Sequence, residues 1–98
     1  MASVDYLWEK VMVAVDCLCA GAGPFEERLY NAYISALMRL DSSDPNAELA
    51  DDLNWVLMVC HRHIVPGGGR MSAVPELDRC KIAEKLVSLL IKSSRMTG

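Results

Sequence analysis

Apolar residues recur every three or four positions through most of the chain, which is the spacing of the buried face of an α-helix. The pattern breaks around residues 21–23, 41–45 and 66–69, where glycine, proline and short polar residues favour turns. No stretch alternates strictly between apolar and polar residues, so no strand is predicted. Four helices are predicted, over about residues 4–19, 24–40, 45–64 and 73–94.

The starts of the predicted helices carry recognisable capping signals. Ser3 is the expected N-cap of the first helix. Pro24 and Pro45 stand at the first positions of the second and third helices, where a missing N–H is tolerated, and Asp44 is the expected N-cap of the third. Short connections favour antiparallel neighbours, so the predicted fold class is all-α, as a compact, four-helix bundle-like single domain.

The third predicted helix has apolar residues around its whole circumference. Leu53 and Leu57 belong to an inner stripe, whereas Trp55, Met58 and Val59 fall largely outside it. A helix that is apolar all round is buried on all sides. We therefore expect this helix to be central in the bundle or shared with a second copy of the chain.

Apolar residues that exceed what one small bundle can hide indicate an interface. Leu89 and Ile91 lie beside the apolar stripe of the fourth predicted helix and add to this surplus. We predict a non-enzymatic protein–protein interaction module that forms a homodimer through the third and fourth helices. The alternative is a wide core that hides these residues. The predicted contact residues are Trp55, Met58, Val59, Leu89 and Ile91.

Composition places the chain among globular proteins, with 52% hydrophobic and 23% charged residues in 98 residues. No apolar run is long enough to span a membrane, and the N-terminus lacks the basic region of a signal peptide. We expect a soluble, cytoplasmic protein with no membrane partner. The four cysteines are therefore expected to be free thiols.

Charge is distributed unevenly along the chain. Residues 1–60 carry ten acids and three bases, for a net charge of −7, whereas residues 61–98 carry a net charge of +4. The acidic part suggests an alternative function as a binder or inhibitor of a heterologous protein, for example from a phage or a host. The acidic total and the few aromatic residues argue against nucleic acid as a partner.

Cys60 and His63 form the one candidate pair of metal ligands on a shared helix face. His61 lies about 200° around the helix from His63, so the two histidines cannot hold one ion together. Zinc needs four ligands, and Cys17 and Cys19 lie on opposite faces of their own helix. The pair supports only the alternative of a small thiol- or metal-dependent protein. A thiol inside an apolar helix reacts poorly, so we predict neither a catalytic residue nor a cofactor, and no enzyme.

One weak set of motifs resembles a pattern in small uncharacterised proteobacterial proteins. The resemblance spans about residues 26–90 and departs from the pattern at residues 73–75, where acidic residues are usual. It implies an all-helical bacterial protein and supplies no activity and no functional residues. The matching residues are Glu27-Arg28-Leu29, Ala32-Tyr33, Leu37, Leu40, Asp44-Pro45, Glu48-Leu49, Asp52, Gly68-Gly69, Met71-Ser72 and Ile82-Ala83-Glu84-Lys85-Leu86.

Overall fold

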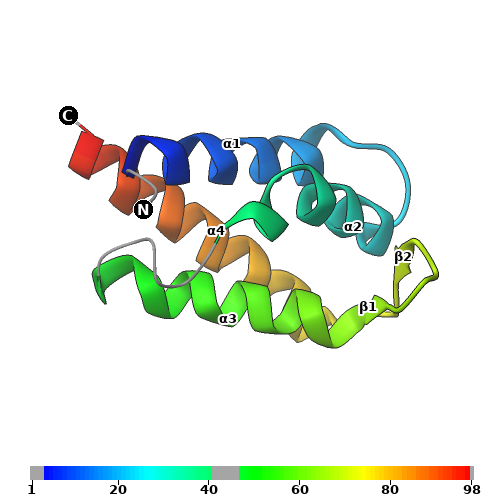
Figure 1. Ribbon diagram of the computed structural model, residues 1–98. Coiled ribbons are helices and arrows are strands. Elements are labelled where there is room, and N and C mark those ends of the chain that lie inside the picture. Colours follow the sequence, from blue (N-terminus) through cyan, green and yellow to red (C-terminus); the bar gives the residue numbers. More distant parts are fainter. Residues whose placement is uncertain (1–3, 41–46, 98) are drawn as a thin grey trace.

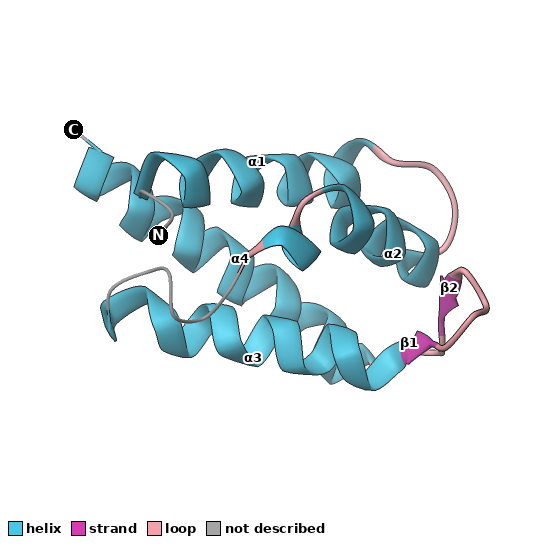
Figure 2. Cartoon of the chain, viewed as in Figure 1, coloured by secondary structure: helices cyan, strands magenta, loops and turns pink. Residues whose placement is uncertain are grey.

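The computed structural model describes residues 4–40 and 47–97, and these form an all-α fold, as predicted (Figures 1 and 2). The expected caps Ser3 and Asp44, together with Pro45, lie outside the described residues. No helix in the described ranges is long and apolar enough to cross a membrane. The α-helices are α1 (Val4–Ala20), α2 (Phe25–Ser35), α3 (Ala47–His63) and α4 (Glu76–Thr97).

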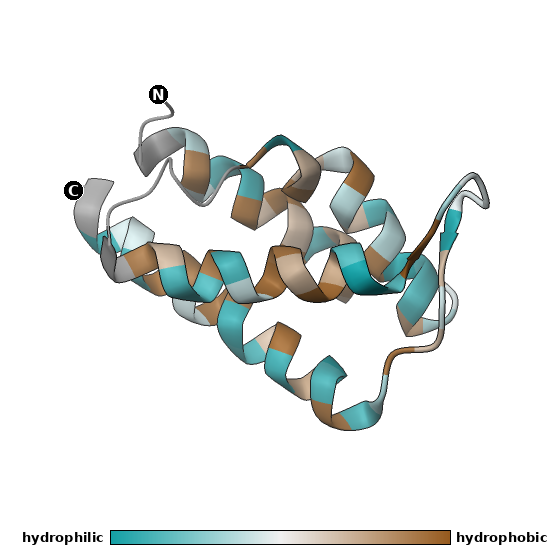
Figure 3. Cartoon of the chain, turned by 60° about the horizontal axis from the view of Figure 1, so that its bottom comes forward, coloured by the Kyte–Doolittle hydropathy of each residue, from teal (hydrophilic) through white to brown (hydrophobic). Residues whose placement is uncertain are grey.

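The helices pack side by side around a shared hydrophobic core. α1 contacts both α2 and α4, and α3 packs against α4 (Figure 1). Bands of apolar and polar residues alternate along each helix, as expected for amphipathic helices that bury one face (Figure 3). Every helix contributes side chains that are fully shielded from solvent, including Val11, Leu29, Leu53, Val56, Ile82 and Leu86.

Three predicted helix bounds are wrong by three to five residues, and one of them is the end of α4, which reaches Thr97 instead of residue 94. The second helix, expected to reach residue 40, ends at Ser35, and the backbone turns at Ala36 (φ −143°, ψ −57°) into a short 3-10 helix, η1 (Leu37–Arg39). Leu37 remains buried after this turn, so the apolar spacing continues although the α-helix does not. The fourth helix begins at Glu76 instead of residue 73, directly after Pro75, whose ring fits the start of a helix.

A short hairpin joins α3 to α4, and the prediction of no strands is therefore wrong. β1 (Ile64–Val65) pairs antiparallel with β2 (Arg70–Met71). Gly67 and Gly69 in the connection have φ values of +71° and +64°, which glycine adopts readily. Strands of two residues are too short to produce an alternating pattern in the sequence.

α3 has one solvent-exposed face, so the expectation that the other helices of the chain surround it is wrong, whereas burial by a second copy stays a prediction. The exposed positions recur at helical spacing and are Asp51, Asn54, Met58 and His61. The buried part of the α3 surface is wide because α3 contributes side chains to the shared core and also packs along α4. α3 is therefore an amphipathic helix with a broad buried arc.

Candidate interaction surface

The structure separates the five predicted contact residues into three groups. Val59 and Leu89 are fully buried and belong to the core, so the prediction that they lie at the surface is wrong. Met58 and Ile91 are exposed, at 45% and 46% of their surface. Trp55 is half-buried, and the Lys81 ammonium lies 4.9 Å from the centre of its ring. A cation over an aromatic face is weakly attracted to it, so Lys81 covers part of the Trp55 ring.

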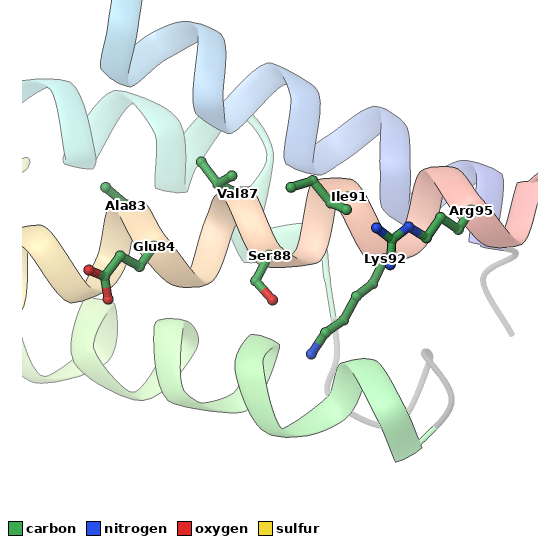
Figure 4. A pocket seen from close by; sticks show the side chains of 7 residues that line it. All are labelled: Ala83, Glu84, Val87, Ser88, Ile91, Lys92 and Arg95. Atoms are coloured by element: carbon green, nitrogen blue, oxygen red, sulfur yellow. The ribbon is translucent and has the colours of Figure 1, made fainter.

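Ile91 lies in a shallow groove of about 550 Å³ along the outer side of α4 (Figure 4). The side chains of Ala83, Val87 and Ile91 point toward the α1 side of the helix, whereas Glu84, Ser88 and Lys92 point toward α3 (Figure 4). Arg95 completes the lining one turn beyond Ile91. We call this groove the α4 face.

The sequence of α4 explains the α4 face directly. Ile82, Leu86 and Leu89 form the buried stripe, and Val87 and Ile91 are four residues apart on another side of the helix. Val87 is exposed to 46%, the same fraction as Ile91, although it reads as a core residue in the sequence. Val87 and Ile91 thus form an apolar pair at the surface, and the helical backbone of α4 fixes their spacing.

The charged residues of the α4 face lie around its apolar centre. Glu84 precedes Val87 by three residues, and Arg95 follows Ile91 by four. The face therefore has an acid at one end, an apolar centre and a base at the other end. An apolar centre with a polar rim is the usual composition of a protein–protein interface.

The apolar surface continues from α4 onto α1. A small cavity of about 60 Å³ lies between the two helices, with Val15 and Cys19 of α1 on one side and Ala83 and Val87 of α4 on the other. Its lining has no polar side chain apart from the cysteine thiol. Met12 is exposed, and it precedes Val15 by three residues on the same flank of α1. The apolar area available to a partner is thus wider than α4 alone.

A polar cluster around Asp52 joins α3 to α4 on the other side of this face. Asp52 is buried, and its carboxylate accepts hydrogen bonds from Lys85 (3.0 Å), Ser88 (3.1 Å) and Lys92 (3.1 Å). Burial alone would raise the pKa of Asp52, but the bonds from Lys85, Lys92 and Ser88 outweigh it and hold the pKa below its usual value. The Lys92 ammonium is therefore directed to α3 and does not cover Ile91.

Met58 lies in a separate groove on the other side of α3. This groove has a volume of about 640 Å³ and lies between η1 and α3, where Met38 is also exposed. Arg39, Asn54 and His61 line it, so its surface is more mixed than that of the α4 face. Met58 and Ile91 therefore do not belong to one contact surface.

Cys60 and His63 do not meet as a reactive pair. Cys60 is fully buried, and burial raises the pKa of its thiol to about 12. His63 instead places its Nδ1 atom 3.1 Å from the Ser72 hydroxyl oxygen, beside the hairpin. Within residues 4–40 and 47–97, no group of three or more His, Cys, Asp or Glu side chains is placed to hold a metal ion. Cys60 is a core residue of α3.

Comparisons with protein-family models, curated proteins and solved structures gave no match for this chain. The resemblance to small proteobacterial proteins stays a prediction that nothing tests. The fold itself defines an all-α, bundle-like domain, and the α4 face is an apolar groove on its surface.

Proposed function

We propose that this chain is a non-enzymatic protein–protein interaction module that forms a homodimer through the α4 face. One observation carries the proposal: Val87 and Ile91 lie side by side in a surface groove, each with 46% of its surface exposed, between charges of opposite sign. Large β-branched side chains that are half exposed together lose contact with water when a second apolar surface covers them.

The size of this effect indicates a weak dimer. Full burial of a valine or isoleucine side chain contributes about 1.5–3 kcal/mol, so covering the exposed half of one contributes about 1 kcal/mol. Two copies cover four such side chains, for about 4 kcal/mol in total. A micromolar dissociation constant corresponds to about 8 kcal/mol, so the flank of α1 and the rim charges must add a similar amount. Val87 and Ile91 alone therefore support only weak association, which is why the experiment below covers a wide range of protein concentrations.

Burial counts against one of the two alternative functions, and internal contacts engage part of the charge on which the other depends. The thiol of Cys60 is buried and its pKa is raised, which opposes a thiol- or metal-dependent role. Of the acids in the first sixty residues, Asp52 is held by two lysines and Glu26 lies 3.9 Å from Arg79 while accepting a hydrogen bond from the Val74 N–H. These two of the ten acids are engaged within the chain, whereas Glu9, Asp16, Glu27 and Asp51 are exposed, so a basic partner stays the alternative to a second copy.

The experiment that tests the proposal compares two substitutions of equal exposure on different surfaces. The mass in solution is measured by light scattering over a hundredfold concentration range for the wild type, Ile91→Glu and Met58→Glu. Both variants add one negative charge at a side chain that is 45–46% exposed, and circular dichroism checks that both remain helical. We expect the wild type and Met58→Glu to approach the dimer mass and Ile91→Glu to remain a monomer. A wild type that stays monomeric at every concentration overturns the proposal, as does an Ile91→Glu variant that dimerises like the wild type.

A further inference from the structure

We infer that two copies of the chain bind with their α4 helices antiparallel, so that Glu84 of each copy lies beside Arg95 of the other. Ile91 of each copy then packs against Val87 and Ser88 of the second copy. This inference rests on the proposed homodimer and adds the orientation and the register of its two helices. It follows from the order of residues along the α4 face.

The outward residues of α4 form a narrow seam. Glu84, Ile91 and Arg95 are exposed and recur along α4 at helical spacing. The exposed Val87 lies on one side of this line, and Ser88, half-buried and bonded to Asp52, lies on the other. In a two-fold symmetric interface every contact occurs twice. If residue i of the first copy contacts residue j of the second, then residue j of the first copy contacts residue i of the second. A two-fold axis that sets Glu84 opposite Arg95 also sets Ser88 opposite Ile91. One arrangement therefore pairs every charge on the seam and places the apolar residues at its centre.

Other arrangements of the same two helices are opposed by charge. A parallel pair would set Glu84 against Glu84 and Arg95 against Arg95, and like charges facing each other across an interface are unfavourable. An antiparallel pair shifted by about one turn would set Glu84 against Ile91 of the second copy. Removing an unpaired carboxylate from water against an apolar side chain is unfavourable. The charges thus specify the antiparallel register with Glu84 beside Arg95.

The same charges favour a second copy over an unrelated protein as the partner. An interface with two-fold symmetry uses one patch twice, so the patch must be complementary to itself. The α4 face meets this condition because an acid and a base flank its apolar centre at opposite ends of the groove. A partner with a single sign of charge would match only one end.

The direct test is a disulfide between two different variants. Glu84→Cys and Arg95→Cys are made in a background where the exposed Cys19 and Cys80 and the half-buried Cys17 are serine, which leaves only the buried Cys60. In the mixed dimer, the two new cysteines face each other, and the remaining Glu84 and Arg95 still form one ion pair. We expect the mixture to give a cross-linked dimer under mild oxidation and each variant alone to give little, because a disulfide needs Cα atoms about 4.4–6.8 Å apart.

The outcomes separate this inference from the proposed function. Cross-links within each variant alone would indicate a parallel pair and overturn the inference. A chain that is dimeric by light scattering but forms no mixed disulfide would overturn the register and leave the homodimer standing. A chain that is monomeric by light scattering would remove both.

Charge reversal provides a second, independent test. Glu84→Arg places like charges together at two symmetric positions, and we expect it to weaken dimerisation roughly tenfold, since an exposed ion pair contributes up to about 1 kcal/mol. The double variant Glu84→Arg with Arg95→Glu restores both pairs in reversed order, and its dissociation constant should return to within about threefold of the wild type. A double variant as weak as the single one would contradict the pairing.

Discussion

Replacing Asp52 with asparagine is expected to destabilise the fold by about 2 kcal/mol. The Asp52 carboxylate accepts three hydrogen bonds of 3.0–3.1 Å, and two of the donors are lysine ammonium groups. A hydrogen bond to a charged group contributes about 1.5–3 kcal/mol to stability. Three such bonds would therefore allow a loss larger than about 2 kcal/mol if nothing replaced them. The side chains of Lys85 and Lys92 are still 29% and 35% exposed, so both can recover water when the carboxylate is lost. This recovery, and the bond that the asparagine oxygen still accepts, reduce the expected loss to about 2 kcal/mol.

The Asp52 cluster also makes stability depend on pH in a definite direction. The pKa of Asp52 in the folded chain lies below its usual value, so the folded state favours the ionised carboxylate more than the unfolded chain does. Its contribution is complete above the unfolded pKa of about 3.9 and is lost as the pH falls through the lower folded pKa. Between neutral pH and acid, the wild type should therefore lose stability more steeply than Asp52→Asn.

The assay is urea denaturation followed by circular dichroism, at neutral pH and at about pH 3, below the usual pKa of aspartate. The protein concentration is kept low enough for the monomer. Asp51→Asn is the matched control, because Asp51 is the neighbouring residue on the exposed face of α3 and its loss should change the unfolding free energy by less than about 0.5 kcal/mol. The reasoning is refuted if Asp52→Asn behaves like Asp51→Asn at neutral pH, or if it keeps the acid dependence of the wild type.

Three further predictions concern the core and the hairpin. Cys60 should react with a maleimide only after denaturant is added, whereas the exposed Cys80 should react at once in the folded chain. Mass spectrometry of the labelled peptides distinguishes the two cysteines, and fast labelling of Cys60 would contradict its burial. Val59→Ala should lower the unfolding free energy by about 2 kcal/mol and Met58→Ala by less than about 0.5 kcal/mol, and equal losses in urea denaturation would contradict the assignment of Val59 to the core. Gly69→Ala should cost about 1 kcal/mol because Gly69 has a φ of +64° that alanine rarely adopts, and a thermal midpoint unchanged from the wild type would argue against that conformation.

The sequence was sufficient to predict four helices because each one buries a continuous apolar stripe. It was not sufficient to end α2 correctly. Leu37 and Leu40 continue the apolar spacing beyond Ser35, although the backbone turns at Ala36. Neither glycine nor proline marks that turn, and both leucines that follow it are buried. Periodicity reports which residues face the core and does not report whether the helix between them is continuous.

Whether each predicted contact residue is buried or exposed could be predicted only in part. Val59 follows Asp52 by seven residues, so the two share a flank of α3. An aspartate normally marks a solvent-exposed flank, but this one is buried against lysines of α4. The flank therefore resembled a surface in the sequence. The exposure of Val87 does not follow from its sequence position either, since this apolar side chain is covered only as far as α1 reaches over α4.

The Asp52 cluster has one more consequence, which concerns the rotation of α4 about its own axis. Lys85, Ser88 and Lys92 all lie on one side of the helix and meet the same carboxylate. Turning α4 by a single residue, about 100°, would carry all three donors away from Asp52. Apolar side chains tolerate such a turn better, because one aliphatic group can replace another in a core. A carboxylate on α3 thus determines which residues of α4 point outward, and a change at Asp52 is expected to alter the proposed association without changing any residue of the α4 face.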